Sequence, residues 1–212
     1  MGLHMKSQDI LLLLKIISLH DKFAGKSFDT EIILLDDEWA DWDEKGLQPS
    51  YYESDHLVNR FSVRNLAEVT GISKSQISLS LNRMYAVGLA KVDRKLQVPN
   101  VNKKALLGFL EHGIRYVFPA KEGGITRGIA TSIAAPVLRG KLMTSGDLQP
   151  VWANPKGRTK GILIEPLHHN VFIAIQEDAQ LYAMLALTDA IRIGHPRERN
   201  LALDMLKNIF KV

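Results

Sequence analysis

Apolar residues recur at helical spacing in four stretches of the chain. In the first, Ile10, Leu13, Leu14 and Ile17 follow the i, i+3, i+4, i+7 rule that places one apolar stripe on a helix. The pattern therefore predicts a helix over residues 7–20, capped by Ser7 or Asp9. The same reasoning predicts a helix at the start of 101–118 that ends around Gly113. It also predicts helices over 176–193 and 196–210, which form a helical hairpin.

Between residues 113 and 175 this periodicity gives way to frequent glycine and proline. Such punctuation is typical of loops and short strands, and the apolar run at 161–167 predicts one of these strands. We interpret the glycine-rich stretch 122–128 as a loop that exposes backbone amides to anions, or as a hinge. The expected fold class is mainly α with small β elements, an α+β protein.

The stretch from 62 to 84 combines residues that a helix-turn-helix requires. Ala67 is small enough for two helices to cross closely, and Gly71 tolerates the positive φ of a sharp turn. Ser73 then caps the second helix, and Ile77 is the apolar residue that locks that helix into the core. We expect these four residues to build the motif.

The second helix of this motif has two chemically different sides. Ile77, Leu81 and Met84 recur at i, i+4, i+7 and should face inward. Polar residues of the types that hydrogen-bond base edges and phosphates remain for the outer side. We expect the following to contact DNA: Lys74, Ser75, Gln76, Ser78, Asn82 and Arg83.

Two short alternating segments after Gly88 flank the sequence Asp93-Arg94-Lys95. This arrangement predicts a small β-hairpin with a basic tip. Arg94 and Lys95 would then reach the DNA backbone or the neighbouring minor groove.

Residues 61–99 resemble the winged helix of MarR-type bacterial transcription regulators. The likeness consists of Leu66-Ala67, Gly71-Ile72-Ser73, Ile77, Leu81 and Gly88-Leu89. It implies a winged helix-turn-helix that binds DNA through the residues named above. The chain departs from that family in an acidic insertion before the motif and in a larger mixed segment after it, so the family's mode of dimerisation and effector site are not carried over.

Charge is unevenly distributed along the chain. Residues 1–60 carry 6 basic and 12 acidic groups, whereas residues 61–100 carry 6 and 2. Ten carboxylates lie in the insertion at about 29–55, which is either a solvated loop or a segment that screens the DNA surface. The basic remainder suits a polyanionic partner. We expect a winged-helix domain over 5–100 and a regulatory or dimerising α+β domain over 101–212.

Other chemistry is weakly represented. The chain has no cysteine, which excludes disulfides and thiolate metal sites and fits a cytoplasmic location. His168 and His169 lack a third ligand at a convincing spacing and, at the end of a strand, would point to opposite faces. The basic loop 156–160 is either a second phosphate contact or a solvated turn. We therefore expect no metal, no cofactor and no enzymatic activity.

The sequence thus predicts a cytoplasmic transcription regulator that binds double-stranded DNA as a homodimer and has no membrane segment. Its C-terminal part would receive a small-molecule effector or a protein partner. The alternative is an antitoxin-like interaction protein whose C-terminal domain binds a cognate protein; an enzyme with a site in 115–170 has less support.

Overall fold

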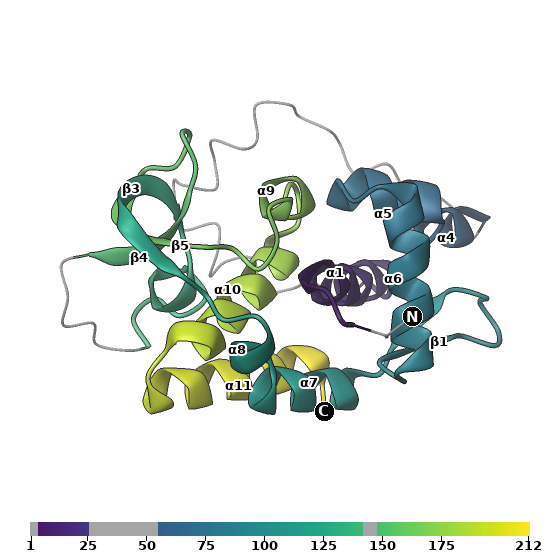
Figure 1. Ribbon diagram of the computed structural model, residues 1–212. Coiled ribbons are helices and arrows are strands. Elements are labelled where there is room, and N and C mark those ends of the chain that lie inside the picture. The colour runs from purple at the N-terminus through teal and green to yellow at the C-terminus, as the bar shows by residue number, and fades with distance from the viewer. Residues whose placement is uncertain (1–3, 26–54, 142–147) are drawn as a thin grey trace.

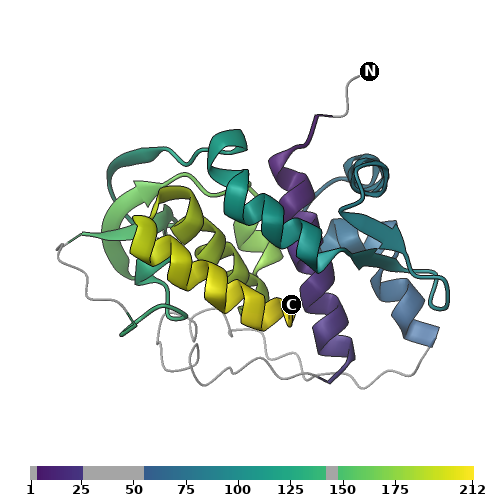
Figure 2. The ribbon, with the colours of Figure 1, turned by 90° about the horizontal axis from the view of Figure 1, so that it is seen from below.

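Helix α1 (Ser7–Phe23) runs through the middle of the molecule, as the computed structural model shows (Figures 1 and 2). The structure describes residues 4–25, 55–141 and 148–212, so almost all of the predicted acidic insertion lies outside it. The sequence predicted one apolar stripe on α1, yet Leu11, Leu12 and Ile16 are also 0% exposed. A helix that is apolar all round is buried on every side. Accordingly, α1 packs against α5, α6, β2 and α10.

The helices and the hairpin expected from residues 61–99 are present on one side of α1. Helix α4 (Asp55–Arg60) leads into α5 (Val63–Thr70) and α6 (Lys74–Ala86). Strands β1 (Ala90–Val92) and β2 (Pro99–Val101) follow as an antiparallel pair. The predicted positions of these elements are confirmed.

The helix expected at the start of 101–118 is present, and a second short helix follows it after Gly113. Helix α7 (Lys103–His112) begins where the Asn102 side chain accepts a hydrogen bond from the Ala105 amide, at 3.2 Å. Helix α8 (Ile114–Val117) follows in a new direction. The end of α7 lies at the glycine where the sequence placed it, whereas α8 was not predicted.

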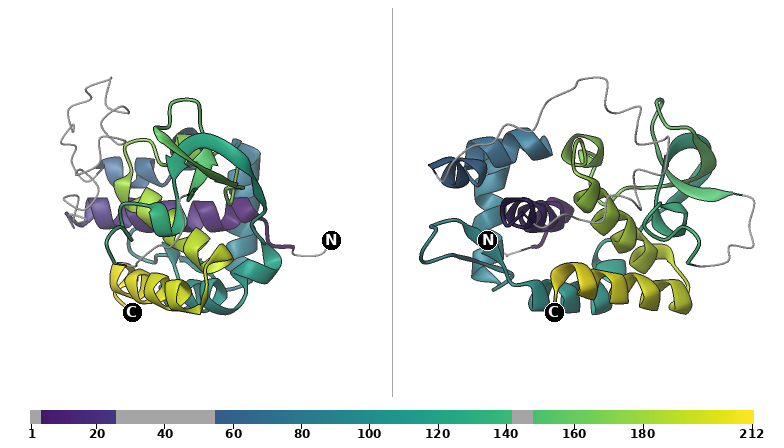
Figure 3. Two further views of the ribbon diagram at one scale, coloured as in Figure 1. Left: turned by 90° about the vertical axis from the view of Figure 1, so that its left-hand side faces the viewer. Right: turned by 180° about the vertical axis from the view of Figure 1, so that it is seen from behind.

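Three strands close into a small barrel at the end of the molecule far from α6 (Figures 1 and 3). Strand β3 (Glu122–Ala130) is antiparallel to both β4 (Gln149–Ala153) and β5 (Thr159–Ile164), which run parallel to each other. The short helix η1 (Ser132–Ala134) follows β3.

The interpretation of 122–128 as a loop or a hinge is therefore wrong. The glycines at 128 and 161 serve close packing: a Cβ added at Gly128 would overlap the carbonyl oxygen of Trp152, and one at Gly161 that of Gln149. Glycine inside a strand often marks such close approach of two backbones. The expected strand at 161–167 is confirmed in part, since β5 begins two residues earlier and ends at Ile164.

A buried carboxylate joins the barrel to the helices. Asp189 of α10 accepts hydrogen bonds from Thr131 Oγ1 at 2.8 Å and from Trp152 Nε1 at 2.6 Å. It also pairs with Arg192 one turn later, with a separation of 2.6 Å. Burial raises the pKa of the Asp189 carboxyl, against the lowering effect of Arg192. The ion pair of Arg192 thus lies within its own helix.

The helical hairpin at the C-terminus is confirmed. Helix α10 (Ala179–Ile193) and helix α11 (Pro196–Phe210) are joined by two residues, and the short helix α9 (Val171–Ala174) precedes them. Helix α10 begins later than predicted because Asp178 is its N-cap and accepts from the Leu181 amide at 3.1 Å. Lys15 Nζ and Ser18 Oγ of α1 also bond this carboxylate, at 2.8 and 2.6 Å.

Helices and two small β structures share one hydrophobic cluster, which makes the protein an α+β fold. Buried residues from both sides of residue 100 belong to that cluster, while the division into two domains stays a prediction. Among the described residues, none of the helices has the length and apolar character that a membrane span requires.

Candidate nucleic-acid interface

The turn between α5 and α6 has the conformation that its residues predict. Gly71 has a φ of +68°, in the left-handed region, and ends α5. Ser73 begins α6, and its hydroxyl accepts a hydrogen bond from the Gln76 amide at 3.4 Å. Ile77 is fully buried, and Ala67 is half-buried beside the core. Gly71, Ser73 and Ile77 therefore have the conformation, cap and burial expected of them, while the close helix crossing at Ala67 stays a prediction.

Helix α6 presents a polar outer side. Lys74, Ser75 and Asn82 are exposed, while Ile77 and Met84 face the core. Ser78 is half-buried and donates its hydroxyl hydrogen to the Lys74 carbonyl at 3.2 Å. These four outer residues lie within the first nine positions of α6, the part of a recognition helix that contacts bases.

Arg83 does not lie on this outer side, which corrects the sequence prediction. Its guanidinium group donates to both carboxylate oxygens of Asp9, from Nε at 3.0 Å and from Nη2 at 2.5 Å. Ser80, one turn earlier, bonds the same carboxylate. Arg83 lies three residues after Ser80, so the two side chains share one face of α6. Ser80 is buried like Ile77 and Met84, and this face therefore points inward. Arg83 therefore positions α6 on α1.

Gln76 lies at the boundary between the outer side of α6 and the side of α6 that contacts α1. Its side chain is half-buried, and its Oε1 accepts a hydrogen bond from Gln8 Nε2 at 3.1 Å. Gln76 therefore lies only partly on the outer side where the sequence placed it. Two of the six predicted contacts on α6 are thus directed toward α1.

Leu79 is the outer residue that the sequence analysis missed. Its side chain is 49% exposed, although it is a large apolar residue in the second turn of α6. It lies four residues after Ser75 and three before Asn82, so all three share one face. Helical spacing contained this signal, but only polar residue types had been considered for the outer face.

The hairpin beside α6 carries exposed cations around an ordered loop. Lys91, Arg94 and Lys95 are exposed. Within the loop, the Asp93 carboxylate accepts hydrogen bonds from the backbone amides of Leu96 and Lys95, both at 2.9 Å. These two amides hold the pKa of the Asp93 carboxyl below its ordinary value. Arg94 and Lys95 therefore extend from a loop whose backbone is fixed by a side chain.

A segment from the C-terminal half packs on the turn at Gly71. A Cβ added to Gly71 would lie 2.8 Å from Ile173 Cδ1 and 3.1 Å from Asn170 Nδ2. The backbone amide of Asn170 in turn donates to His168 Nδ1 at 3.1 Å. A larger residue at this turn would have to adopt a left-handed φ and would also displace the ends of these two side chains.

The two adjacent histidines differ from the sequence prediction. They follow β5 in a loop, and their rings stack at 4.2 Å between centroids and do not point to opposite faces. Partial burial and the neighbouring His169 lower the pKa of His168 to about 4. Within the described residues, no group of three or more His, Asp or Glu side chains is placed to hold a metal ion.

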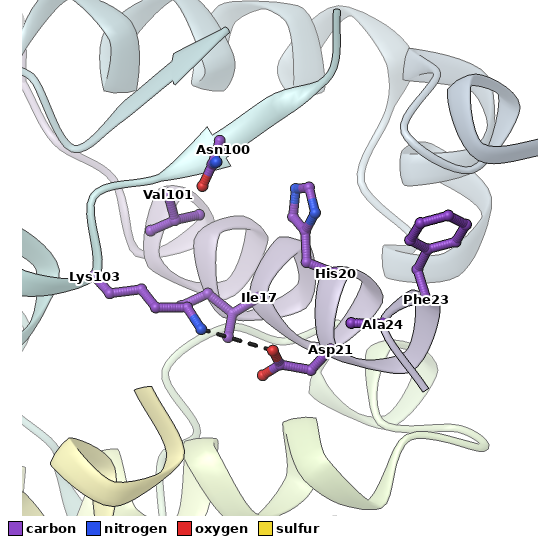
Figure 4. A pocket seen from close by; sticks show the side chains of 8 residues that line it. All are labelled: Ile17, His20, Asp21, Phe23, Ala24, Asn100, Val101 and Lys103. Atoms are coloured by element: carbon purple, nitrogen blue, oxygen red, sulfur yellow. Dashed lines mark ion pairs between the residues drawn. The ribbon is translucent and has the colours of Figure 1, made fainter. Parts of the chain in front are cut away.

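A pocket of about 260 Å³ lies at the base of the hairpin, between the end of α1 and the start of α7 (Figure 4). His20 Nε2 is 2.8 Å from the carbonyl oxygen of Pro99 there, and Lys103 Nζ lies 3.7 Å from Asp21 Oδ1. Apolar residues of both elements, among them Ile17 and Val101, also line the pocket. The pocket thus lies where the end of α1 meets strand β2 of the hairpin.

Comparison of the chain with models of protein families, with curated proteins and with solved structures finds no match. The resemblance to MarR-type regulators thus rests on the motif residues of the sequence alone.

Proposed function

We propose that the protein is a sequence-specific DNA-binding transcription regulator that reads the major groove with α6. The observation that carries this proposal is the combination of a three-residue turn at left-handed Gly71 with an exposed polar face on the helix that follows. Helix pairs with this geometry place the first turns of their second helix against base edges. In this proposal the unit α5–α6 with β1 and β2 is a winged helix-turn-helix.

The charges around α6 support the proposal. Lys74 lies at the start of the helix, and Arg94 and Lys95 lie at the tip of the hairpin. In a duplex complex the outer face of α6 would face the bases, while the hairpin would lie over the flanking backbone. The DNA-contact set becomes Lys74, Ser75, Ser78, Leu79, Asn82, Arg94 and Lys95, with Gln76 at its edge.

The proposed assembly is a homodimer on a two-fold symmetric operator, with no enzymatic step. Selection of bound duplexes from a random DNA pool at near-physiological salt tests binding, specificity and symmetry together. We expect recovery of a palindrome whose half-sites lie about 10 base pairs apart. Failure to enrich any sequence would contradict the proposal.

Two variants report on the proposed interface in the recovered duplex. Asn82→Ala should weaken specific binding at least about fivefold, because a side-chain contact to a base is lost. Lys74→Ala should lower the slope of log affinity against log salt by about one, because one phosphate contact is lost. Lys207→Ala, which removes an exposed lysine of α11, is the matched control and should leave both quantities unchanged.

A second candidate function is binding of a cognate protein through the barrel. On the outer side of β3 and β5, Arg127 lies directly opposite Lys160, and Ile125 opposite Ile162. Both cations are exposed, and Ile125 is 58% exposed. Like charges directly opposite destabilise a sheet, and exposed isoleucine gains from burial. A protein surface with acidic residues around an apolar centre would pair with the two cations and bury the isoleucine side chains.

Charge reversal separates the two candidate functions. Arg127→Glu with Lys160→Glu should abolish co-purification of a protein partner while leaving duplex binding intact, because the barrel and α6 lie at opposite ends (Figure 3). Lys207→Glu is the control for nonspecific charge effects. Unchanged co-purification after reversal would exclude the barrel as the docking surface.

A further inference from the structure

The centre of the outer face of α6 is apolar. Leu79 is 49% exposed and is flanked by Ser75 and Ser78 on one side and Asn82 on the other. These neighbours are short, uncharged residues, so the leucine side chain is the largest group on this part of the face. An exposed leucine at this place contributes nothing to the core, which Ile77, Leu81 and Met84 already fill.

We infer that Leu79 is a specificity-determining residue that recognises the C5-methyl group of thymine. This inference rests on the proposed function, since it requires α6 to lie in the major groove. There the thymine methyl is the apolar group that a base pair displays, and apolar side chains contact it. The position in the second turn of α6, between two polar residues of the same face, is where base edges are reached.

The flanking residues fit this role. Ser75 and Asn82 can hydrogen-bond the polar edges of neighbouring bases, whereas Leu79 has no donor or acceptor in its side chain. A cytosine amino group or a guanine carbonyl facing Leu79 would lose its water without gaining a hydrogen bond. The preferred half-site therefore contains a thymine at the position that faces Leu79.

The test uses the duplex recovered by selection and replaces its thymines one at a time with deoxyuridine. This base keeps the pairing edge and O4 of thymine and lacks only the methyl group. For the wild-type chain, we expect one thymine in each half-site at which the replacement raises the Kd about three- to fivefold. For Leu79→Ala, the same replacement should leave the Kd unchanged, because the contact is already lost.

Leu148→Ala is the matched control. Leu148 is a similarly exposed leucine, at 40%, which lies just before β4 on the barrel. This variant should retain the full sensitivity to deoxyuridine. Alanine at position 79 is a good helix former on an exposed face, so the fold is kept; far-UV circular dichroism checks this.

The outcomes separate the inference from the proposed function. If no duplex is enriched, the proposed function fails. If a duplex is enriched but no deoxyuridine replacement weakens binding, or Leu79→Ala responds like wild type, the recognition of thymine by Leu79 is wrong and DNA binding stands.

Discussion

The carboxylate of Asp9 is the polar centre of the contact between α1 and α6. It is 0% exposed and accepts hydrogen bonds from the Lys6 amide, the Ser80 hydroxyl and the Arg83 guanidinium. A buried carboxylate is tolerated because these donors replace the lost water. The orientation of α6 on the protein thus depends on one charged pair as well as on its apolar residues.

Replacement of Arg83 by alanine should therefore lower stability. The substitution leaves the Asp9 carboxylate buried without its cation, which costs about 3 kcal/mol of the free energy of unfolding. Urea denaturation measures this loss. Asn82→Ala, on the exposed side of the same turn, is the control and should change stability by less than about 0.5 kcal/mol. Equal midpoints for both variants would show that the Asp9 pair does not stabilise the fold.

His168 should make stability depend on pH. Its folded pKa of about 4 lies below the ordinary value of 6.5, so the folded protein favours the neutral ring. The stability that the neutral His168 ring contributes is fully present above pH 6.5 and is lost as the pH falls toward 4. Between pH 7.5 and 5 the wild type should lose about 1–2 kcal/mol more than His168→Asn, which keeps an acceptor for the Asn170 backbone amide. Parallel stability curves for the two proteins between pH 7.5 and 5 would contradict this role.

At the scale of elements, the α5–α6 turn is held from outside by α9. Gly71 meets two requirements there, a positive φ and the absence of a Cβ beside Ile173. Gly88, which follows α6, has a similar φ of +74° and no atom within 4 Å of an added Cβ. Comparing substitutions at these two glycines therefore distinguishes the cost of backbone strain from the cost of packing against α9.

Gly71→Ala should be more destabilising than Gly88→Ala. Both substitutions cost about 1–2 kcal/mol for the left-handed conformation, and Gly71→Ala adds the displacement of Ile173. Ile173→Ala in the Gly71→Ala background should recover part of the additional loss. The free energies of unfolding of the single and double variants measure the coupling. Identical losses for the two glycine variants would mean that α9 does not constrain the turn.

The elements differ in how far local sequence determined them. The turn at Gly71, the caps at Ser73 and Asn102 and the start of α11 at Pro196 depend on neighbours a few residues away, and these were predictable. Strand β3 was not, because its glycines are explained by Trp152 and other residues distant in sequence. The same limit applied to Arg83, whose partner Asp9 lies 74 residues earlier.

At the scale of the whole molecule, one core connects the motif side with the barrel side. Helix α1 packs on α5 and α6 as well as on α10, and Asp189 attaches the barrel strands to α10. A protein with a single continuous core unfolds cooperatively. The barrel and the helices should therefore lose structure together.

This expectation can be tested with one tryptophan as a reporter of the barrel. With Trp39 and Trp42 replaced by phenylalanine, Trp152 is the remaining tryptophan of three. Its fluorescence and the far-UV circular dichroism of the helices should give coincident urea transitions. A barrel transition at lower urea concentration would instead identify two independent folding units divided near residue 100.

The two attachments of α1 also limit how a regulatory signal can act. Asp9 and Ser18 are nine residues apart, about 14 Å along one unbroken helix, and each joins α1 to a different half of the molecule. No hinge interrupts this rod, so a protein or small molecule on the C-terminal half cannot tilt α6 independently. In the proposed dimer, the junction of the two chains would then set the distance between the two α6 helices, and control of DNA binding would act on that junction or on access to the groove.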